Sequence, residues 1–311
     1  MKSSVRGSLM LMTAAIIWGA AFVAQSVGMD YVGPFTFTGI RFILGGLVLL
    51  PIVSWMKRSN PQDKSENAAQ PNTRMLLLGG VVCGVILFAA SSLQQIGLQT
   101  TNPGKAGFVT TLYILIVPLM GLPFGKKVSS NVWVGVFLSA VGLYLLCVQD
   151  GFRLERGDAA VLLCALIYSF HIWAIDYLSP RVNGVALSCI QFFVAGILGL
   201  AAMFALEKPV LSQILACWLP ICYTGFLSCA VAYTFQILGQ RETNPTLAAL
   251  VLSLESVFAA LFEWILLKSG LSLRELIGAA LMFSAILLAQ IPSVRRPSRQ
   301  PRASHGLGTG D

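Results

Sequence analysis

The chain of 311 residues is 56% hydrophobic and only 11% charged, and its charged residues cluster between long apolar stretches. Soluble domains carry about 25% charged residues, so this composition excludes an ordinary soluble protein. The net charge of +8 does not indicate nucleic-acid binding, because the basic residues lie mainly in loops and in the segment 293–302 rather than on one helix face. We therefore predict an all-α membrane protein; the alternating pattern of a transmembrane β-barrel is absent.

Ten apolar stretches are each long enough for a helix to cross a bilayer core of about 30 Å. The polar segment 55–74 separates the second from the third, and residues 292–311 are predicted to form a disordered, basic, cytoplasmic tail. The first stretch follows basic residues as a signal peptide does, but its length and the stretches after it favour an uncleaved helix. The predicted spans are 7–25, 34–54, 75–98, 103–123, 131–148, 157–178, 184–206, 212–237, 245–267 and 272–291.

The distribution of lysine and arginine predicts the orientation. With the N-terminus inside the cell, fourteen basic residues fall in inner loops and tails and six in outer loops. An even number of spans places both termini on the same side. We therefore expect an integral protein of the plasma or inner membrane with both termini in the cytoplasm.

An internal repeat divides the chain. The tripeptide Thr-Asn-Pro occurs at 101–103 and again at 243–245, and Asn followed by Pro is typical of a helix start. Gln94 and Gly97 recur at the same offset of 142 as Gln236 and Gly239, and the first and sixth spans align at an offset of 150. The pattern predicts two five-helix repeats, 1–150 and 151–291. Because five is odd, the two repeats have opposite orientations in the membrane.

Two stretches resemble a known family. The segment AAIIWGAAF (14–22) and the C-terminal segment 253–289 are similar to the EamA-like members of the drug/metabolite transporter superfamily. The resemblance implies ten helices, a central cavity lined mainly by helices 1, 3, 4, 6, 8 and 9, and transport of small organic solutes, often outward. The sequence departs from the family at Ser256, where proline is frequent, and at Lys268, in a hairpin that often contains glutamate.

Ionisable residues within the predicted spans are functional candidates, because they are costly in lipid. Glu255 lies near the middle of the ninth span, and Tyr113 occupies the matching position in the first repeat. Glu255 could bind a substrate amine, carry a coupling proton, or hydrogen-bond a neighbouring helix. His171 lies one turn after Tyr168 and suits either proton coupling or a helix–helix hydrogen bond. Arg41 is expected to extend to the outer headgroups, with binding of a substrate carboxylate as the alternative.

Further polar and aromatic side chains are candidates for the walls of the pathway, with ordinary packing or helix capping as the alternative. Trp18 and Gln25 share one face of the first span, and amides end the third and eighth spans, where they could line the two mouths. Glu263, near the outer end of the ninth span, is expected to reach the interface. The candidates for the substrate cavity or for coupling are Trp18, Gln25, Gln94, Tyr113, Tyr168, His171, Tyr233, Gln236 and Glu255.

The motifs of other classes of protein are missing from the sequence. It contains no Walker pattern, no H-E-x-x-H, no G-x-S-x-G and no C-x-x-C, so we expect no nucleotide, metal or cofactor. We predict a secondary transporter and not an enzyme: an exporter of amino acids or related metabolites, with the bilayer, a small-molecule substrate and a possible proton as its partners. Alternatives are an importer or facilitator of another solute (sugar, nucleobase or drug), or an intramembrane enzyme. The sequence does not indicate the oligomeric state.

Overall fold

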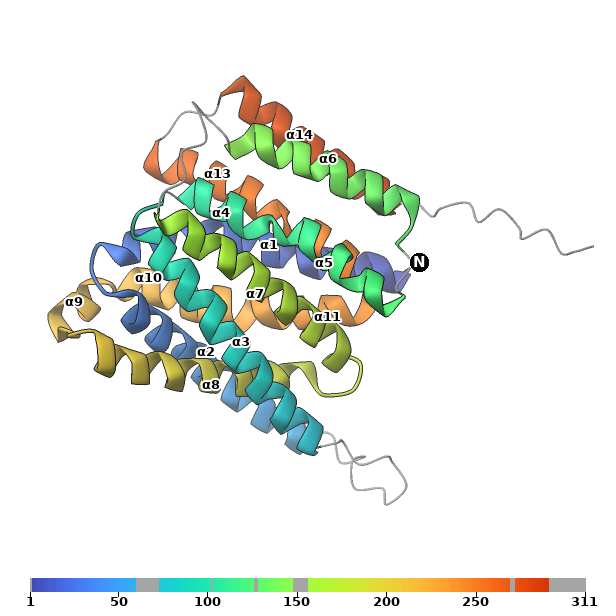
Figure 1. The fold of residues 1–311 in the computed structure, drawn as a ribbon. Helices are drawn as coiled ribbons and strands as arrows, with labels where there is room; N and C mark the ends of the chain where they lie inside the picture. The colour runs from blue at the N-terminus through green and yellow to red at the C-terminus, as the bar shows by residue number, and fades with distance from the viewer. Residues whose placement is uncertain are drawn as a thin grey trace, which may run out of the picture.

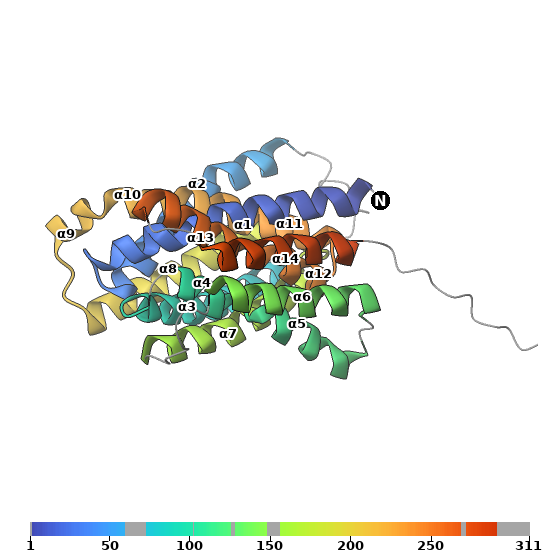
Figure 2. The same ribbon diagram turned by 90° about the horizontal axis from the view of Figure 1, so that it is seen from above.

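The computed structural model of the protein describes residues 2–59, 73–101, 103–125, 128–147, 156–268 and 272–290. Throughout these ranges the regular elements are helices, and most of them run along one common direction (Figures 1 and 2). The predicted tail 292–311, residues 60–72 of the predicted polar segment and Asn102 lie outside the described residues, so the expectations for them stay predictions.

The helices reproduce the apolar stretches of the sequence. By length and composition, eight stretches within the described helices can cross a membrane, and they correspond to eight of the ten predicted spans. The elements up to residue 147 are α1 (Lys2–Met29), α2 (Pro34–Ser59), α3 (Thr73–Leu98), α4 (Pro103–Thr111), α5 (Tyr113–Gly121), η2 (Leu122–Phe124) and α6 (Ser130–Cys147). The remaining elements are α7 (Arg156–Leu178), α8 (Gly184–Leu206), α9 (Leu211–Ala216), α10 (Trp218–Tyr223), η3 (Thr224–Tyr233), α11 (Thr234–Glu242), α12 (Pro245–Leu252), α13 (Leu254–Leu267) and α14 (Leu273–Gln290).

The other two predicted spans, 131–148 and 272–291, correspond to α6 and α14. These helices have 18 residues each and lie side by side at one edge of the bundle (Figure 1). A helix of this length rises about 27 Å, which is close to the thickness of a bilayer core.

Two long spans are interrupted near their middle. The fourth predicted span divides into α4 and α5 at Leu112, and the ninth divides into α12 and α13 at Ser253. The backbone is nearly the same at both breaks, with φ −58° and ψ −12° at Leu112 and φ −59° and ψ −16° at Ser253. This tighter, 3₁₀-like geometry shortens the hydrogen-bonded turn locally. The sequence interpretation expected continuous helices at both places.

The eighth span also differs from its prediction of 212–237. The short helix α9 precedes it, and the stretch that can cross a membrane is Trp218–Glu242, which consists of α10, η3 and α11. Within it, η3 is a π-helix of ten residues. π-Helices are rare and are usually a single turn at a functional site, so a segment of this length is unusual.

The second Thr-Asn-Pro copy begins a helix as predicted. The side chain of Asn244 accepts a hydrogen bond from the backbone N–H of Leu247 at 2.8 Å, and Pro245 is the first residue of α12. The first copy has the same register, because α4 begins at Pro103.

Helices from the two predicted repeats pack against one another through glycines. Helix α3 lies along α7, where a Cβ atom on Gly157 would come within 2.7 Å of the carbonyl oxygen of Gly97. Helix α1 lies along α11, where a Cβ atom on Gly7 would come within 3.0 Å of the carbonyl oxygen of Gly239. Small residues let helix backbones approach closely, which is how helices associate within lipid.

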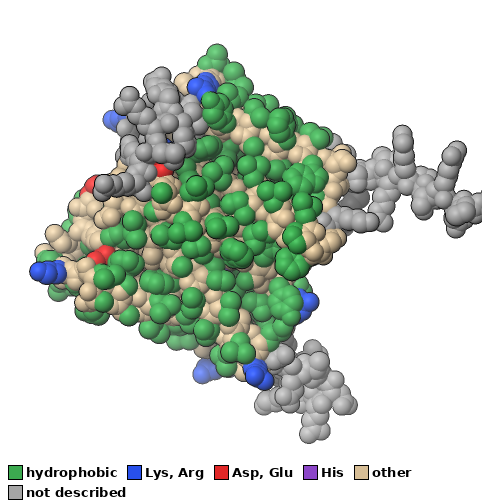
Figure 3. All heavy atoms as spheres, in the orientation of Figure 1, with side chains coloured by type: hydrophobic (Ala, Val, Ile, Leu, Met, Phe, Trp, Pro, Cys, Tyr) green, Lys and Arg blue, Asp and Glu red, His purple; other side chains and the backbone are tan. Residues whose placement is uncertain are grey.

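The surface of the bundle is apolar. In Figure 3, hydrophobic side chains cover most of the visible face, and the charged side chains lie toward its margins. Large side chains such as Phe137, Phe204 and Leu287 are 67%, 75% and 69% exposed. Exposing an apolar surface of this extent to water is unfavourable, and such a surface is typical of one that contacts lipid.

Candidate substrate cavity

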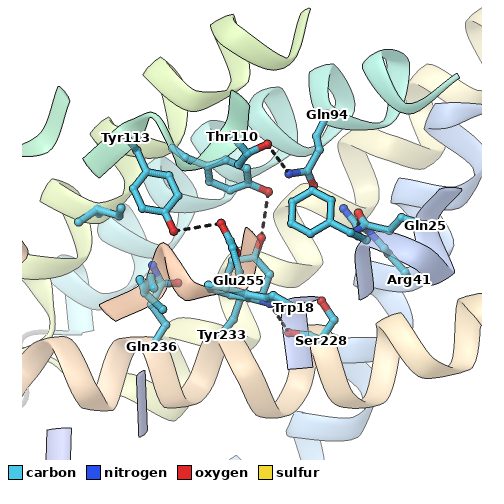
Figure 4. Close-up of a pocket in the computed structure, with 14 residues that line it drawn as sticks. Trp18, Gln25, Arg41, Gln94, Thr110, Tyr113, Ser228, Tyr233, Gln236 and Glu255 are labelled. Atoms are coloured by element: carbon cyan, nitrogen blue, oxygen red, sulfur yellow. Dashed lines mark hydrogen bonds between the residues drawn. The ribbon is translucent and has the colours of Figure 1, made fainter. Parts of the chain in front are cut away.

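A narrow cavity lies inside the bundle, between helices of both predicted repeats (Figure 4). Its free volume is about 40 Å³, enough for a few water molecules at about 10–15 Å³ each. Eight of the nine residues that the sequence singles out line it, the exception being His171. The full lining is Trp18, Phe22, Gln25, Arg41, Gln94, Thr110, Tyr113, Tyr168, Ile172, Ser228, Tyr233, Gln236, Leu252 and Glu255.

Tyr113 and Glu255 form a buried hydrogen bond in the wall of the cavity. The tyrosine hydroxyl donates to Oε1 of Glu255 at 3.0 Å, and the two residues are 4% and 5% exposed. Each follows directly after an interrupted turn, Tyr113 one residue after Leu112 and Glu255 two residues after Ser253. The sequence matched these two positions as equivalents of each other but did not predict their contact.

Aromatic side chains form a second cluster. The ring centroids of Trp18 and Tyr233 are 4.7 Å apart in an edge-on arrangement. The hydroxyl of Tyr233 lies 3.1 Å from that of Tyr168, which lies 3.0 Å from Oγ of Ser91. The indole nitrogen of Trp18 donates to the carbonyl oxygen of Ser228 in η3 at 3.3 Å. The π-helix thus contributes a backbone acceptor to the cavity wall, which the sequence did not predict.

The amides Gln94 and Gln236 line the same cavity. The side-chain N–H of Gln94 donates to Oγ1 of Thr110 at 3.2 Å. The buried Oε1 of Gln236 has no hydrogen-bond partner among the described residues. A buried acceptor without a donor costs free energy, so Gln236 can accept a hydrogen bond from a solute or from water.

His171 does not line the cavity. It is fully buried, its ring lies edge-on to those of Tyr168 and Tyr233, and its Nε2 lies 3.0 Å from Oε1 of Gln191 on α8. This contact matches the helix–helix alternative for His171, and its role in coupling stays a prediction.

Arg41 is the main correction to the sequence interpretation. We expected its side chain to extend to the outer headgroups, but it is only 3% exposed and lines the cavity. Its Nη1 donates to Oε1 of Gln25 at 2.5 Å, and its guanidinium carbon lies 4.9 Å from the ring centroid of Phe42. The sequence held a signal for this inward position, because the matching position in the second predicted repeat, Gln191, is also polar.

Glu263 does not simply extend to the interface either. Its Oε2 accepts a hydrogen bond from the backbone N–H of Gly104, in the first turn of α4, at 3.0 Å. A carboxylate at a helix N-terminus is favoured both by the free N–H groups and by the helix dipole. Glu263 therefore links α13 to the start of α4 and is not among the residues that line the cavity.

An apolar bundle of membrane-crossing helices around a small cavity that contains polar and ionisable side chains is typical of a membrane transporter. The sequence model of the EamA-like transporter family matches residues 5–148 and, a second time, residues 155–290. The chain therefore belongs to the EamA-like transporter family.

Similar proteins agree with this assignment. An uncharacterized transporter of Archaeoglobus fulgidus is 30% identical over 284 residues, which cover 90% of this chain and 84% of that protein. The uncharacterized inner membrane transporter YedA of Escherichia coli K12 is 23% identical over 291 residues, which cover 91% and 90%. A crystal structure with 21% sequence identity aligns with a TM-score of 0.72 over 91% of this chain and 96% of that one, which shows a common fold.

Proposed function

We propose that the protein is a secondary active transporter that exports amino acids or related small metabolites across the cell membrane by alternating access. The observation that carries this proposal is the cavity inside the bundle, whose walls combine polar and apolar side chains of both predicted repeats and in which Tyr113 and Glu255 are hydrogen-bonded. Ionisable and polar groups at bilayer depth are costly, and they typically pair with one another or face a cavity, where they mark candidate pathways for a solute or a proton. Import or facilitated diffusion of another solute is the alternative on the same cavity.

The proposal includes ten membrane spans in two inverted repeats, 1–150 and 151–291, with both termini in the cytoplasm. Three features support it. The family model matches the chain twice. The interrupted turns at Leu112 and Ser253 have the same backbone conformation. The close approach of α3 to α7 at Gly97 has its counterpart between α1 and α11 at Gly239, the position 142 residues later.

The small volume of the cavity fits one state of an alternating-access cycle. A space for a few waters cannot hold a metabolite of amino-acid size, and small-molecule sites usually measure about 300–1,000 Å³. Helices around the cavity therefore have to move before a solute enters. The breaks at Leu112 and Ser253 are candidate hinges, because discontinuous helices frequently form the substrate sites of secondary transporters.

Transport is tested with purified protein in proteoliposomes. Vesicles preloaded with one unlabelled amino acid at a time are exposed to a trace of the labelled compound, and its uptake is followed. We expect saturable uptake and counterflow for at least one compound. Flux that rises linearly with concentration would indicate a channel, and no flux for any amino acid or related metabolite would contradict the proposed substrate class.

Proton coupling is tested with an imposed pH gradient. If Glu255 carries the coupling proton, Glu255→Gln removes the dependence of flux on the gradient. Glu263→Gln is the control, because Glu263 is a partly buried carboxylate on the same helix, α13, but lies outside the cavity lining. His171→Ala tests the second candidate in the same way. An unchanged gradient dependence in both Glu255→Gln and His171→Ala would remove these residues as coupling sites.

A further inference from the structure

The guanidinium group of Arg41 is buried without a counter-charge. The side chain is 3% exposed, and no carboxylate of the described residues lies within ion-pair distance of it. Its neighbours are the amide of Gln25 and the rings of Phe37 and Phe42, whose centroids lie 5.6 and 4.9 Å from the guanidinium carbon. In Figure 4, Arg41 and Gln25 lie on one side of the cavity, and Tyr113 and Gln236 lie on the other.

Burying the Arg41 guanidinium costs free energy that helix packing alone does not require. An arginine remains charged in proteins, and a buried charge without a partner is destabilising. The rings offset part of this cost by cation–π attraction, and Gln25 supplies a neutral acceptor. Neither neutralises the charge. Of the described residues that line the cavity, Arg41 is the one Lys or Arg, so among them it is the cationic partner for an anionic group that enters.

The hydrogen-bonding capacity of Arg41 is largely free. Of the five N–H donors of a guanidinium, one is used in the bond from Nη1 to Gln25, and the buried Nε has no partner within the part of the chain that the structure describes. The Nε and Nη2 atoms form the edge of the guanidinium that matches two oxygens of a carboxylate. Gln25 holds the opposite side of the group and so orients this edge.

We propose that Arg41 binds the carboxylate of the transported solute; this inference rests on the proposed transport function and narrows its substrate to organic acids, amino acids among them. A single arginine fits one carboxylate better than a phosphate, which usually recruits several donors or a helix N-terminus. The walls next to it, including Trp18, Phe22 and Tyr168, provide apolar and aromatic surface for the body of the solute. The free acceptor of Gln236 suits an N–H or O–H group on that body.

The test uses pairs of compounds that differ only in the carboxylate, namely leucine with leucinamide and tryptophan with tryptophanamide. Thermal stabilisation of the purified, detergent-solubilised protein reports binding, because a ligand of the native state raises its apparent stability. In the unmodified protein we expect the acid to bind about 10- to 100-fold more tightly than the amide, as charge-assisted hydrogen bonds predict. In Arg41→Gln this preference should disappear.

Two further variants make the result specific. Arg41→Lys keeps the charge but loses the two-pronged geometry, so it should retain only part of the preference. Arg181→Gln makes the same chemical change at an exposed arginine outside the cavity and should retain all of it. If Arg41→Gln does not yield folded protein, the Arg41→Lys result decides, since a preference equal to that of the unmodified protein would contradict the role of the guanidinium edge.

The outcomes separate this inference from the transport function. A preference for the acid that survives in Arg41→Gln, or its absence from both acid–amide pairs in the unmodified protein, overturns the role of Arg41. Counterflow measured in parallel tests transport by itself. If carboxylate binding depends on Arg41 but no counterflow is seen, the binding site is supported and the transport proposal is contradicted. If counterflow occurs and Arg41→Gln leaves it unchanged for acids and amides alike, transport is supported and the role of Arg41 is contradicted.

Discussion

Removing the hydroxyl of Tyr113 isolates a single hydrogen bond inside the cavity. The variant Tyr113→Phe keeps the ring, so it changes packing little, but it leaves Oε1 of Glu255 without its donor at a position where both residues are about 95% buried. A hydrogen bond to a charged group contributes about 1.5–3 kcal/mol and a neutral one about 1 kcal/mol. We therefore expect Tyr113→Phe to lower the free energy of unfolding by about 1.5–3 kcal/mol if Glu255 is ionised, and by about 1 kcal/mol if it is protonated.

The measurement is reversible unfolding in mixed detergent micelles, followed by the loss of helical circular dichroism. Tyr144→Phe is the matched control, because Tyr144 is 53% exposed on the outside of the bundle and should lose less than about 0.5 kcal/mol. In a Glu255→Gln background the acceptor is neutral, so Tyr113→Phe should cost about 1 kcal/mol there. A loss no larger than that of Tyr144→Phe in both backgrounds would refute the reasoning, because it would mean that the bond contributes nothing to stability.

Three other predictions concern the packing of the helices, and each is measured by the same unfolding experiment. Glu207→Ala should cost about 1–2 kcal/mol, because Glu207 accepts hydrogen bonds from both backbone and side-chain donors in the first turn of α2; a neutral result would show that water replaces it. Gly19→Ala should lower the free energy of unfolding by about 1–3 kcal/mol, because its Cβ would lie 2.3 Å from that of Phe258. Gly107→Ala is the control and should be nearly neutral, because its Cβ would make no contact under 3.4 Å; equal effects of the two variants would contradict the packing. Asn244→Ala should cost about 1 kcal/mol through loss of the helix cap, and no change would show that the cap is dispensable.

Much of the fold could be predicted from hydrophobicity, because the length of an apolar stretch directly reflects the thickness of a bilayer. The interruptions at Leu112 and Ser253 could not be predicted in this way. Both lie inside long, mostly apolar runs, and neither is a proline or a glycine. Hydroxyl groups beside the breaks bond backward to the helix, Thr111 to Phe108 and Ser253 to Leu250, but such bonds also occur in unbroken helices. The same limit applies to η3, since its sequence resembles that of an ordinary helix.

The candidate residues illustrate what a single sequence can reveal about a cavity. Polarity within the predicted spans identified Glu255 near mid-depth and Gln236 near a span end, because such side chains are rare in lipid and have to face protein or water. Gln94 and Gln236 were expected to line two separate mouths, but they line the same cavity. The direction of a side chain depends on how its helix packs against the others, and the residues around it in the sequence do not determine that packing. Arg41 was therefore interpreted as extending outward although it lines the cavity, and His171 was named as a candidate for the cavity or for coupling although it is not among the lining residues.

The contacts between α2 and α8 constrain how the cavity can open. Glu207 follows the last residue of α8 and is hydrogen-bonded to Phe35 and Thr36 at the start of α2. Along the same helix pair, the backbones approach so closely that a Cβ atom on Gly199 would lie 2.6 Å from Cα of Gly39. A close-packed backbone contact resists sliding, so these two helices are expected to move together as one rigid body. If the proposed transport cycle operates, its moving parts are then expected to be pairs of helices drawn from both predicted repeats, so that neighbours in the sequence need not move together.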